Sequence, residues 1–433
     1  MIAMPTKGVI HNTAPVLNAI AKSGLSQEAF AGAVEVSLSF LKKLIKGRAV
    51  TPDFVKRVAT YSGIPYSEFV TPGDDYSENL EALLASRRYN FEGGVVNAIP
   101  LYGADTDYAT RERVMVEYDP SPFMIRPPRL KVQVERWLAQ KEEEVKRKKK
   151  QGIHIDFFNG PCARLVSVGS QLESSRVHIL LGSIGWHAFS GLWGVLARKV
   201  TPHKYEQYLG LSHILRDGNI THSKLGNIFC CAVTLITSDG YAGYQIRGVS
   251  PSADPGAFTS TVAENINRFL DETSPDGLPL HIHENKDPRG SDNGYVPEGR
   301  NVPHPFTAAR RGIISEISPR LEEHADALKL AGVVYSLRDY EPTALFVVPL
   351  SLTREKLLGM YSKHHPKEFS EGRLKFTKAT LTDPDTVKLL ARDKWITGGK
   401  ASLVRALQLI DAISFKNRLD WGGAFEYLRT EGN

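Results

Sequence analysis

The chain contains few cysteines. Cys162, Cys230 and Cys231 are the only ones in 433 residues, too few for a framework of disulfides. Cys230 and Cys231 are adjacent within an apolar run, a setting typical of buried thiols in a reducing compartment. The sequence therefore argues against a small disulfide-stapled secreted scaffold, and we expect a cytoplasmic protein.

Long apolar runs are missing as well. No stretch reaches the roughly 18 residues that a membrane-spanning helix needs, so no membrane partner is expected. The first residues, MIAMPTKGVIHNTAP, lack a basic start, an apolar core and a cleavage site, so we expect no secretion signal. A hydrophobic content of 42% indicates a globular protein, and 433 residues are enough for two or three domains.

Acidic residues are absent from one short stretch, Ser37–Arg48, which instead carries four basic residues. On either side of it, apolar residues between positions 12 and 70 recur at three- and four-residue steps, which predicts closely spaced short helices. Ser26 is predicted to cap one helix, Gly47 to end the next, and Thr51-Pro52 to begin another. The block is expected to end at 71–75, TPGDD.

Two helices joined by a tight turn would place the start of the second helix against base edges in the major groove. In this arrangement Phe30, Val36 and Leu41 are expected to fill the wedge between the helices, and Ala31 and Ala33 to permit close approach. The residues that we expect to face DNA bases are Ser37, Leu38, Ser39 and Lys42. The residues that we expect to follow the phosphates are Lys43, Lys46 and Arg48.

The stretch LSQEAFAGAVEVSLSFLKKLIKG, Leu25–Gly47, resembles the helix-turn-helix of the XRE-type (Cro-like phage repressor) family. Thr51–Val70 is similar to the two helices that complete that domain. The resemblance implies an all-α DNA-binding domain over residues 1–75, in which Gln27 bonds to the DNA backbone. Glu35 replaces a common glycine in the turn, and Leu38 replaces a common polar reader, which favours contact with a thymine methyl group. The alternative is a helical module that binds protein or has no partner.

Residues 76–155 are expected to connect two domains. Prolines at 120, 122, 127 and 128 interrupt regular structure, and a single helix is predicted over Arg129–Lys150, with acidic and basic residues four positions apart. Its last five residues are Lys-Arg-Lys-Lys-Lys. We interpret this helix as a solvent-facing connector, and the alternative is a basic arm that contacts DNA phosphates.

Residues 156–433 are predicted to form a large α+β domain. The expected strands are Val177–Leu181, Ile228–Ile236, Gly243–Arg247 and Ala344–Leu350. Thr237–Tyr241, TSDGY, predicts a hairpin turn. The expected helices are Ser260–Leu270, Phe306–Ile317, Arg354–His364 and Ala401–Ile413.

The order of the hairpin, Pro255–Ile266 and His304–Leu321 resembles the Nudix hydrolase fold, a mixed sheet sandwiched by helices. That family carries G-x5-E-x7-R-E-U-x-E-E-x-G, whose glutamates bind a divalent metal. Arg311, Ile313 and Glu316 match, whereas Gly312 and Ser315 replace two glutamates. Prolines at 297 and 303 and Ser318 occupy three further motif positions. The resemblance therefore implies a ligand sensor that has lost hydrolysis, and we expect no metal cofactor. The alternative is that Arg311 and Glu316 are only surface residues of an amphipathic helix. The predicted ligand-binding residues are Arg247, Glu264, Arg311 and Glu316.

Two other features resemble ligand sites. His281 and His283 share one face of an expected surface strand, with Glu284 and His304 near in sequence, but no cysteine pair completes a zinc site. Leu180–Gly194, LLGSIGWHAFSGLWG, lacks the Gly-Lys-Ser/Thr of a phosphate loop and is interpreted as a packed strand and turn that does not lead into a helix.

The sequence therefore predicts a homodimeric regulator that binds double-stranded DNA and senses a nucleotide-like ligand. Dimerisation is expected because one helix-turn-helix reads only a half-site. The alternative is a Mg²⁺-dependent hydrolase of a nucleoside-diphosphate derivative, in which Glu316 and Arg311 would be catalytic. A protein-interaction scaffold is a third class.

Overall fold

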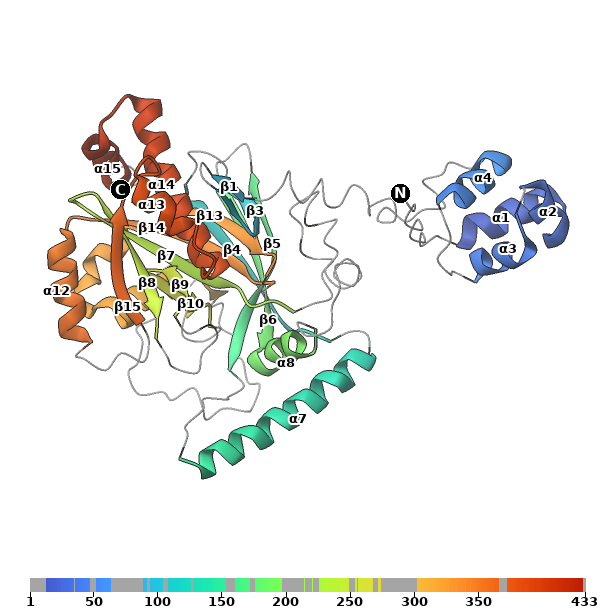
Figure 1. Ribbon diagram of the computed structural model, residues 1–433, viewed down its shortest axis with the longest axis horizontal. Helices are drawn as coiled ribbons and strands as arrows, with labels where there is room; N and C mark the ends of the chain where they lie inside the picture. The colour runs from blue at the N-terminus through green and yellow to red at the C-terminus, as the bar shows by residue number, and fades with distance from the viewer. Residues whose placement is uncertain are drawn as a thin grey trace. The chain divides into compact units, whose positions relative to one another are not determined.

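The chain divides into two compact units, Met1–Ser86 and Arg87–Asn433 (Figure 1). The computed structural model describes residues 13–34, 36–46, 52–63, 89–91, 94–103, 108–125, 128–152, 160–171, 176–196, 214, 220, 226–248, 254, 256–267, 272–273, 302–338, 340–365 and 372–430. No helix among these residues is long and apolar enough to cross a membrane. Because the larger unit begins at Arg87, most of the segment 76–155, expected to be a connector, belongs to that unit instead.

The described part of Met1–Ser86 contains four helices. They are α1 (Thr13–Ser23), α2 (Gln27–Ala33), α3 (Leu38–Ile45) and α4 (Pro52–Ser62). The Ser26 hydroxyl accepts a hydrogen bond from the Ala29 N–H at 3.2 Å, so the predicted cap of α2 is confirmed. The predicted start at Pro52 is confirmed too, whereas the predicted signals at 47, 51 and 71–75 lie outside the described residues.

One apolar core holds these four helices together. Its buried members are Val16, Ala19, Phe30, Ala31, Val34, Leu41, Val58 and Ala59. Phe30 and Leu41 join α2 to α3 as expected, and Val36 packs against this core while partly exposed. Ala33 is exposed and therefore does not serve the expected close approach. The shared core fixes the direction of α3 relative to α2.

The larger unit is α+β, as predicted, and is built on an eight-stranded mixed sheet with the order β15-β8-β7-β14-β13-β3 (Figure 1). These strands are β15 (Gly372–Lys378), β8 (Tyr241–Arg247), β7 (Cys230–Thr237), β14 (Pro342–Leu350), β13 (Lys329–Ser336) and β3 (Ala98–Tyr102). β14 runs parallel to β7, and the other named pairs are antiparallel. β9 (Phe258–Ser260) pairs with β8, and β10 (Val262–Asn265) pairs with β7.

Helices cover both faces of this sheet. The Thr234 hydroxyl lies 2.9 Å from the hydroxyl of Ser402 in α14 (Thr397–Asn417), and α15 (Trp421–Thr430) packs against α14. On the opposite face, the Cys231 thiol donates to the carbonyl of Pro305, the first residue of α11 (Pro305–Gly312), at 3.4 Å. Because successive residues of a strand point to opposite faces, the sheet lies between two helical layers.

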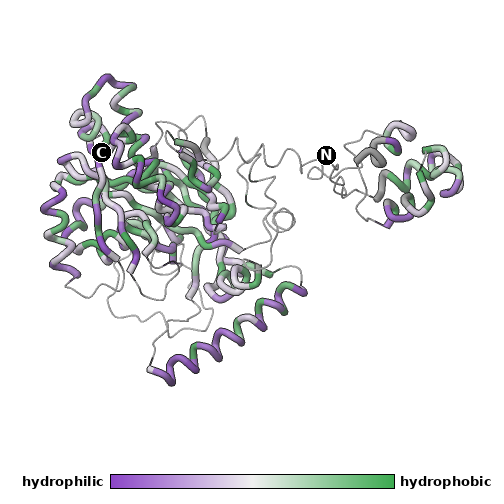
Figure 2. Tube along the Cα trace, viewed as in Figure 1, coloured by the Kyte–Doolittle hydropathy of each residue, from purple (hydrophilic) through white to green (hydrophobic). Residues whose placement is uncertain are grey.

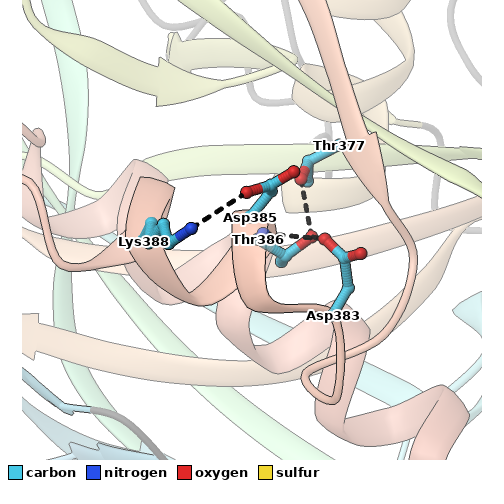
Figure 3. Close-up of polar contacts among 5 residues, drawn as sticks. All are labelled: Thr377, Asp383, Asp385, Thr386 and Lys388. Atoms are coloured by element: carbon cyan, nitrogen blue, oxygen red, sulfur yellow. Dashed lines mark hydrogen bonds and ion pairs between the residues drawn. The ribbon is translucent and has the colours of Figure 1, made fainter.

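Two further helices flank β15. α12 (Arg354–His364) has the bounds that the sequence predicts. α13 (Pro384–Leu390) begins at Asp383, whose carboxylate accepts from the Thr386 N–H at 2.8 Å and the Thr386 hydroxyl at 2.9 Å (Figure 3). The Thr386 hydroxyl also lies 2.6 Å from that of Thr377 in β15, so this cap ties α13 to the sheet edge.

A second, three-stranded sheet has the order β4-β6-β5. Its strands are β4 (Val114–Pro122), β6 (Arg176–Gly185) and β5 (Pro161–Gln171), and its helices are α7 (Pro128–Lys150) and α8 (Trp186–Leu196). α8 follows β6 without a break, so the interpretation of Leu180–Gly194 as a strand that does not lead into a helix is wrong. Short two-stranded pairs complete the unit: β1 (Tyr89–Phe91) with β2 (Gly94–Val96), and β11 (Glu272–Thr273) with β12 (Val302–Pro303).

The expected helix over Ser260–Leu270 is also wrong. This segment forms the end of β9 and all of β10, and residues 268–271 lie outside the described part of the chain. Thr259, Thr261 and Val262 are β-branched and favour a strand, and the pairing of β9 with β8 and of β10 with β7 overrides the helical spacing of the apolar positions. The hairpin at Thr237–Tyr241 is confirmed, with Gly240 at φ 83° in its turn.

Candidate functional site

The first candidate surface lies on α3. Ser37, Ser39, Lys42, Lys43 and Lys46 are all exposed, and we call this set the α3 surface. The helix contains no acidic residue. Buried Leu41 holds its opposite side against α2, so the basic side chains face away from the core. A helix that presents cations on one side fits the phosphate backbone of a nucleic acid.

Three other predicted DNA-facing residues have different surroundings. Gln27 is the exposed first residue of α2, beside the start of α3 in the expected motif. Leu38 is partly buried and packs against the core of Met1–Ser86, so only part of its side chain is available to a ligand. Arg48 lies outside the described residues. The structure thus leaves the serine and lysine residues of the α3 surface exposed to solvent.

The second candidate site forms where α11 crosses β10. The Arg311 guanidinium lies 2.9 Å from the Glu264 carboxylate and donates to the Asn265 carbonyl at 3.0 Å. The Glu316 carboxylate accepts from the Ala263 N–H at 3.4 Å. Glu264, Arg311 and Glu316, which we call the β10–α11 cluster, therefore come together although they are far apart in sequence.

Arg247 does not join this cluster. Tyr244 is in register with Ser260 and Ile246 with Phe258, so Arg247 lies beyond the N-terminal end of β9. Glu264 follows β9 in the other direction along the chain. Of the four predicted ligand-binding residues, the structure brings together three.

Gly312 explains how α11 approaches β10 so closely. A Cβ atom at this position would clash with Val262 and would lie 2.7 Å from the Glu264 Cγ atom. A glutamate at this point of the Nudix motif would have to displace those side chains. With glycine at this position the motif carboxylate is absent, and α11 packs directly on β10.

The β10–α11 cluster offers few oxygen ligands to a divalent metal. Glu264 is paired with Arg311, Ser315 stands in place of one carboxylate, and Pro303 belongs to β12. Within the described ranges, no group of three or more His, Cys, Asp or Glu side chains is arranged to hold a metal ion. A hard cation needs several oxygen ligands at once. The positions 281, 283, 284 and 297 lie outside the described residues.

Two histidines that the sequence analysis did not select fix the end of α11. The helix continues into a π-helical turn, Ile313–Ile317. A ring nitrogen of His364 lies 3.1 Å from the Ser315 carbonyl, and one of His365 lies 2.7 Å from the Glu316 carbonyl. Because a carbonyl only accepts, each of these ring nitrogens carries the hydrogen. The C-terminal end of α12 thus holds the turn that carries Glu316. In the sequence, the signal for this contact is the pair of adjacent histidines at the end of a predicted helix.

His304 holds the other end of α11. Its side chain is buried, and its Nδ1 atom accepts from the Phe306 N–H at 3.3 Å. Burial lowers the pKa of His304 to about 3; the nearby Arg111 guanidinium also lowers it, and a hydrogen bond to the Val114 backbone opposes the shift. The ring is therefore neutral and serves as a helix cap, which accounts for this histidine without a metal.

No protein-family model matches the chain, and no curated protein matches it either.

Proposed function

We propose that the protein is a sequence-specific DNA-binding regulator and that α3 is its recognition helix. The observation that carries this proposal is the α3 surface, which is exposed, free of acidic residues and held on a helical core by Leu41 and Phe30. Ser39 and Lys42 are the base-reading residues, because they lie near the start of the helix. Lys43 and Lys46 contact phosphates and supply affinity that is independent of sequence.

In this proposal the larger unit is a Nudix-like sensor of a nucleotide-like ligand, and it also dimerises. The β10–α11 cluster supports the assignment, since Arg311 and Glu316, which match the Nudix motif, lie beside Glu264 of β10. Arg311 supplies a cation suited to a phosphate, and binding proceeds without hydrolysis. A ligand changes DNA affinity only if it binds the free and DNA-bound forms unequally.

The test is selection of bound duplexes from a random DNA pool, repeated with a nucleotide library present. The expected result is an enriched motif with two-fold symmetry, because a dimer places one α3 in each half-site. A nucleotide that the sensor binds is expected to change the yield of that motif. Recovery of unenriched DNA would contradict sequence-specific recognition.

The alternative is a Mg²⁺-dependent hydrolase, which the assembly of Glu264, Arg311 and Glu316 at one place favours. It predicts Mg²⁺-dependent release of phosphate from nucleoside-diphosphate derivatives, abolished in Glu316→Gln. We prefer the regulator because the cluster offers two carboxylates, one of them paired with Arg311. Turnover by the purified protein that Glu316→Gln removes would reverse that preference.

Dimerisation is measured separately, by sedimentation of the full chain with and without DNA. A monomer under both conditions would contradict the two-fold arrangement. A scaffold protein, the third class, would show neither DNA selection nor nucleotide turnover.

A further inference from the structure

The C-terminal end of α7 lies beyond the buried residues of this helix. Leu130 and Val134 are its buried residues. Val134 and Trp137 pack where Gly191 and Gly194 of α8 have no side chain, and an added Cβ atom at either glycine would clash with them. Burial lowers the pKa of His187, and Glu142 opposes that shift, so Glu142 lies near the first turn of α8. Residues 143–150 continue past this point for about 12 Å.

This overhanging end has more basic charge than its own acidic residues neutralise. Glu144 pairs with Lys141 at 2.6 Å and with Lys148 at 3.0 Å, and Glu143 pairs with Lys146 at 3.0 Å. The exposed residues Arg147, Lys149 and Lys150 have no ion pair with another described residue. Figure 2 shows α7 as one of the most hydrophilic segments of the larger unit.

The basic residues are not needed to end the helix. The Gln151 N–H donates to the Lys148 carbonyl at 2.9 Å, and the Gly152 N–H donates to the Lys149 carbonyl at 3.0 Å. Gly152 has φ 77°, the left-handed conformation that commonly ends helices. Backbone N–H groups therefore satisfy the Lys148 and Lys149 carbonyls without help from the basic side chains.

We propose that the end of α7, Lys146–Lys150, is a second contact with the phosphate backbone of duplex nucleic acid. This contact rests on the proposed DNA-binding function and adds to it an affinity that is blind to sequence. Arg147 and Lys150 lie three positions apart, on one side of the helix, so both reach the same strand of phosphates. The partner is recognised by charge and not by bases.

The test compares the full-length protein with the triple variant Arg147→Gln/Lys149→Gln/Lys150→Gln. Binding to a short random-sequence duplex is followed by fluorescence anisotropy between about 50 and 200 mM salt. Each lost phosphate contact lowers the slope of log K against log salt by about 0.9, so the slope is expected to fall by about 2 to 3 and affinity by at least tenfold. Glutamine preserves helix propensity, so the helix is retained.

The matched control removes the same charge from the anchored half of α7, in Arg129→Gln/Lys131→Gln/Arg136→Gln. These three positions are exposed as well. We expect the control to keep the wild-type slope. An unchanged slope in the Arg147 triple variant, or an equal change in both triple variants, would overturn the inference.

Two further measurements distinguish DNA binding from membrane binding and the α7 contact from the α3 contact. Loss of binding to phosphatidylserine vesicles with duplex binding unchanged would assign this surface to a membrane and overturn the inference. Ser39→Ala/Lys42→Ala tests α3 in the same assay with selected DNA. If this variant leaves binding unchanged while the Arg147 triple variant weakens it, the α3 proposal fails and the α7 contact stands; the reverse result removes only the α7 contact.

Discussion

Arg311 and Glu264 form an ion pair at 2.9 Å that fastens α11 to β10. The side chains are only 18% and 21% exposed. Loss of one partner leaves the other charge with little water and without this counterion. Arg311→Met is therefore expected to lower the free energy of unfolding by roughly 2 to 4 kcal/mol.

Urea unfolding followed by tryptophan fluorescence measures this loss, because all five tryptophans lie in the larger unit. The double variant Arg311→Met/Glu264→Leu is expected to lose less than the sum of the single variants. The control is Arg429→Met, which breaks a 2.6 Å pair with Glu426 at 40% and 55% exposure. A comparable loss of unfolding free energy in Arg429→Met would show that the burial of the Arg311–Glu264 pair does not set the size of the effect.

Gly312 provides a second prediction. Because an added Cβ atom would press on Val262 and Glu264, Gly312→Ala is expected to destabilise the larger unit by about 1 to 3 kcal/mol. Gly359 in α12 has no atom within 4 Å of such a Cβ, so Gly359→Ala is expected to stabilise by about 0.5 to 1 kcal/mol. Thermal unfolding of both variants measures the two changes in stability. Changes of the same sign would contradict close packing at Gly312.

The buried cap at His304 predicts acid sensitivity. The pKa of this side chain is about 3 in the folded protein, and in the unfolded chain it is about 6.5. Between these values the unfolded chain binds the proton and the folded protein does not, so stability falls as pH decreases, by up to about 1.4 kcal/mol per pH unit.

Urea unfolding between pH 7 and pH 4 tests this dependence against His304→Asn. Asparagine keeps a helix-capping oxygen and removes the titration. The two curves are expected to converge as pH falls, because only the wild type loses stability through this group. Parallel curves would show that His304 does not titrate in this range.

The α3 surface predicts two kinds of DNA-binding defect. Ser39→Ala and Lys42→Ala are expected to relax preference for the selected motif, with a cost of about 1 to 3 kcal/mol for a lost base contact. Lys46→Ala is expected to weaken all duplexes alike and to lower the salt slope by about 1. Competition binding with selected and random duplexes separates these effects. DNA binding that none of the three changes affects would show that α3 is not the recognition helix.

Local signals made much of the fold predictable. The hairpin at Thr237–Tyr241 and the helix α12 follow from a turn sequence and a helical period that do not depend on distant residues. Ser260–Leu270 was predicted wrongly because its apolar spacing competes with the pairing of Val262–Asn265 with β7. The strand is decided by that pairing, which the local sequence does not encode.

The candidate sites were also predictable only where they depend on neighbouring residues. The cap at Ser26 and the exposed lysines of α3 follow from neighbouring residues. The pairing of Arg311 with Glu264 does not, since the sequence marks both as ligand-binding residues without showing that they are in contact. The β10 strand brings Glu264 to Arg311 from far upstream in the chain, and only the sheet register reveals this.

The Tyr89 hydroxyl donates to the Gln408 side chain at 2.6 Å, across 319 positions of the chain. β3 is a strand of the eight-stranded sheet, and α14 covers one face of that sheet. The first strand of the sheet and its covering helix therefore come from opposite ends of the larger unit. During synthesis on the ribosome β3 emerges well before the helix that shields the sheet. The core between the sheet and α14 is therefore completed only after α14 has been synthesised.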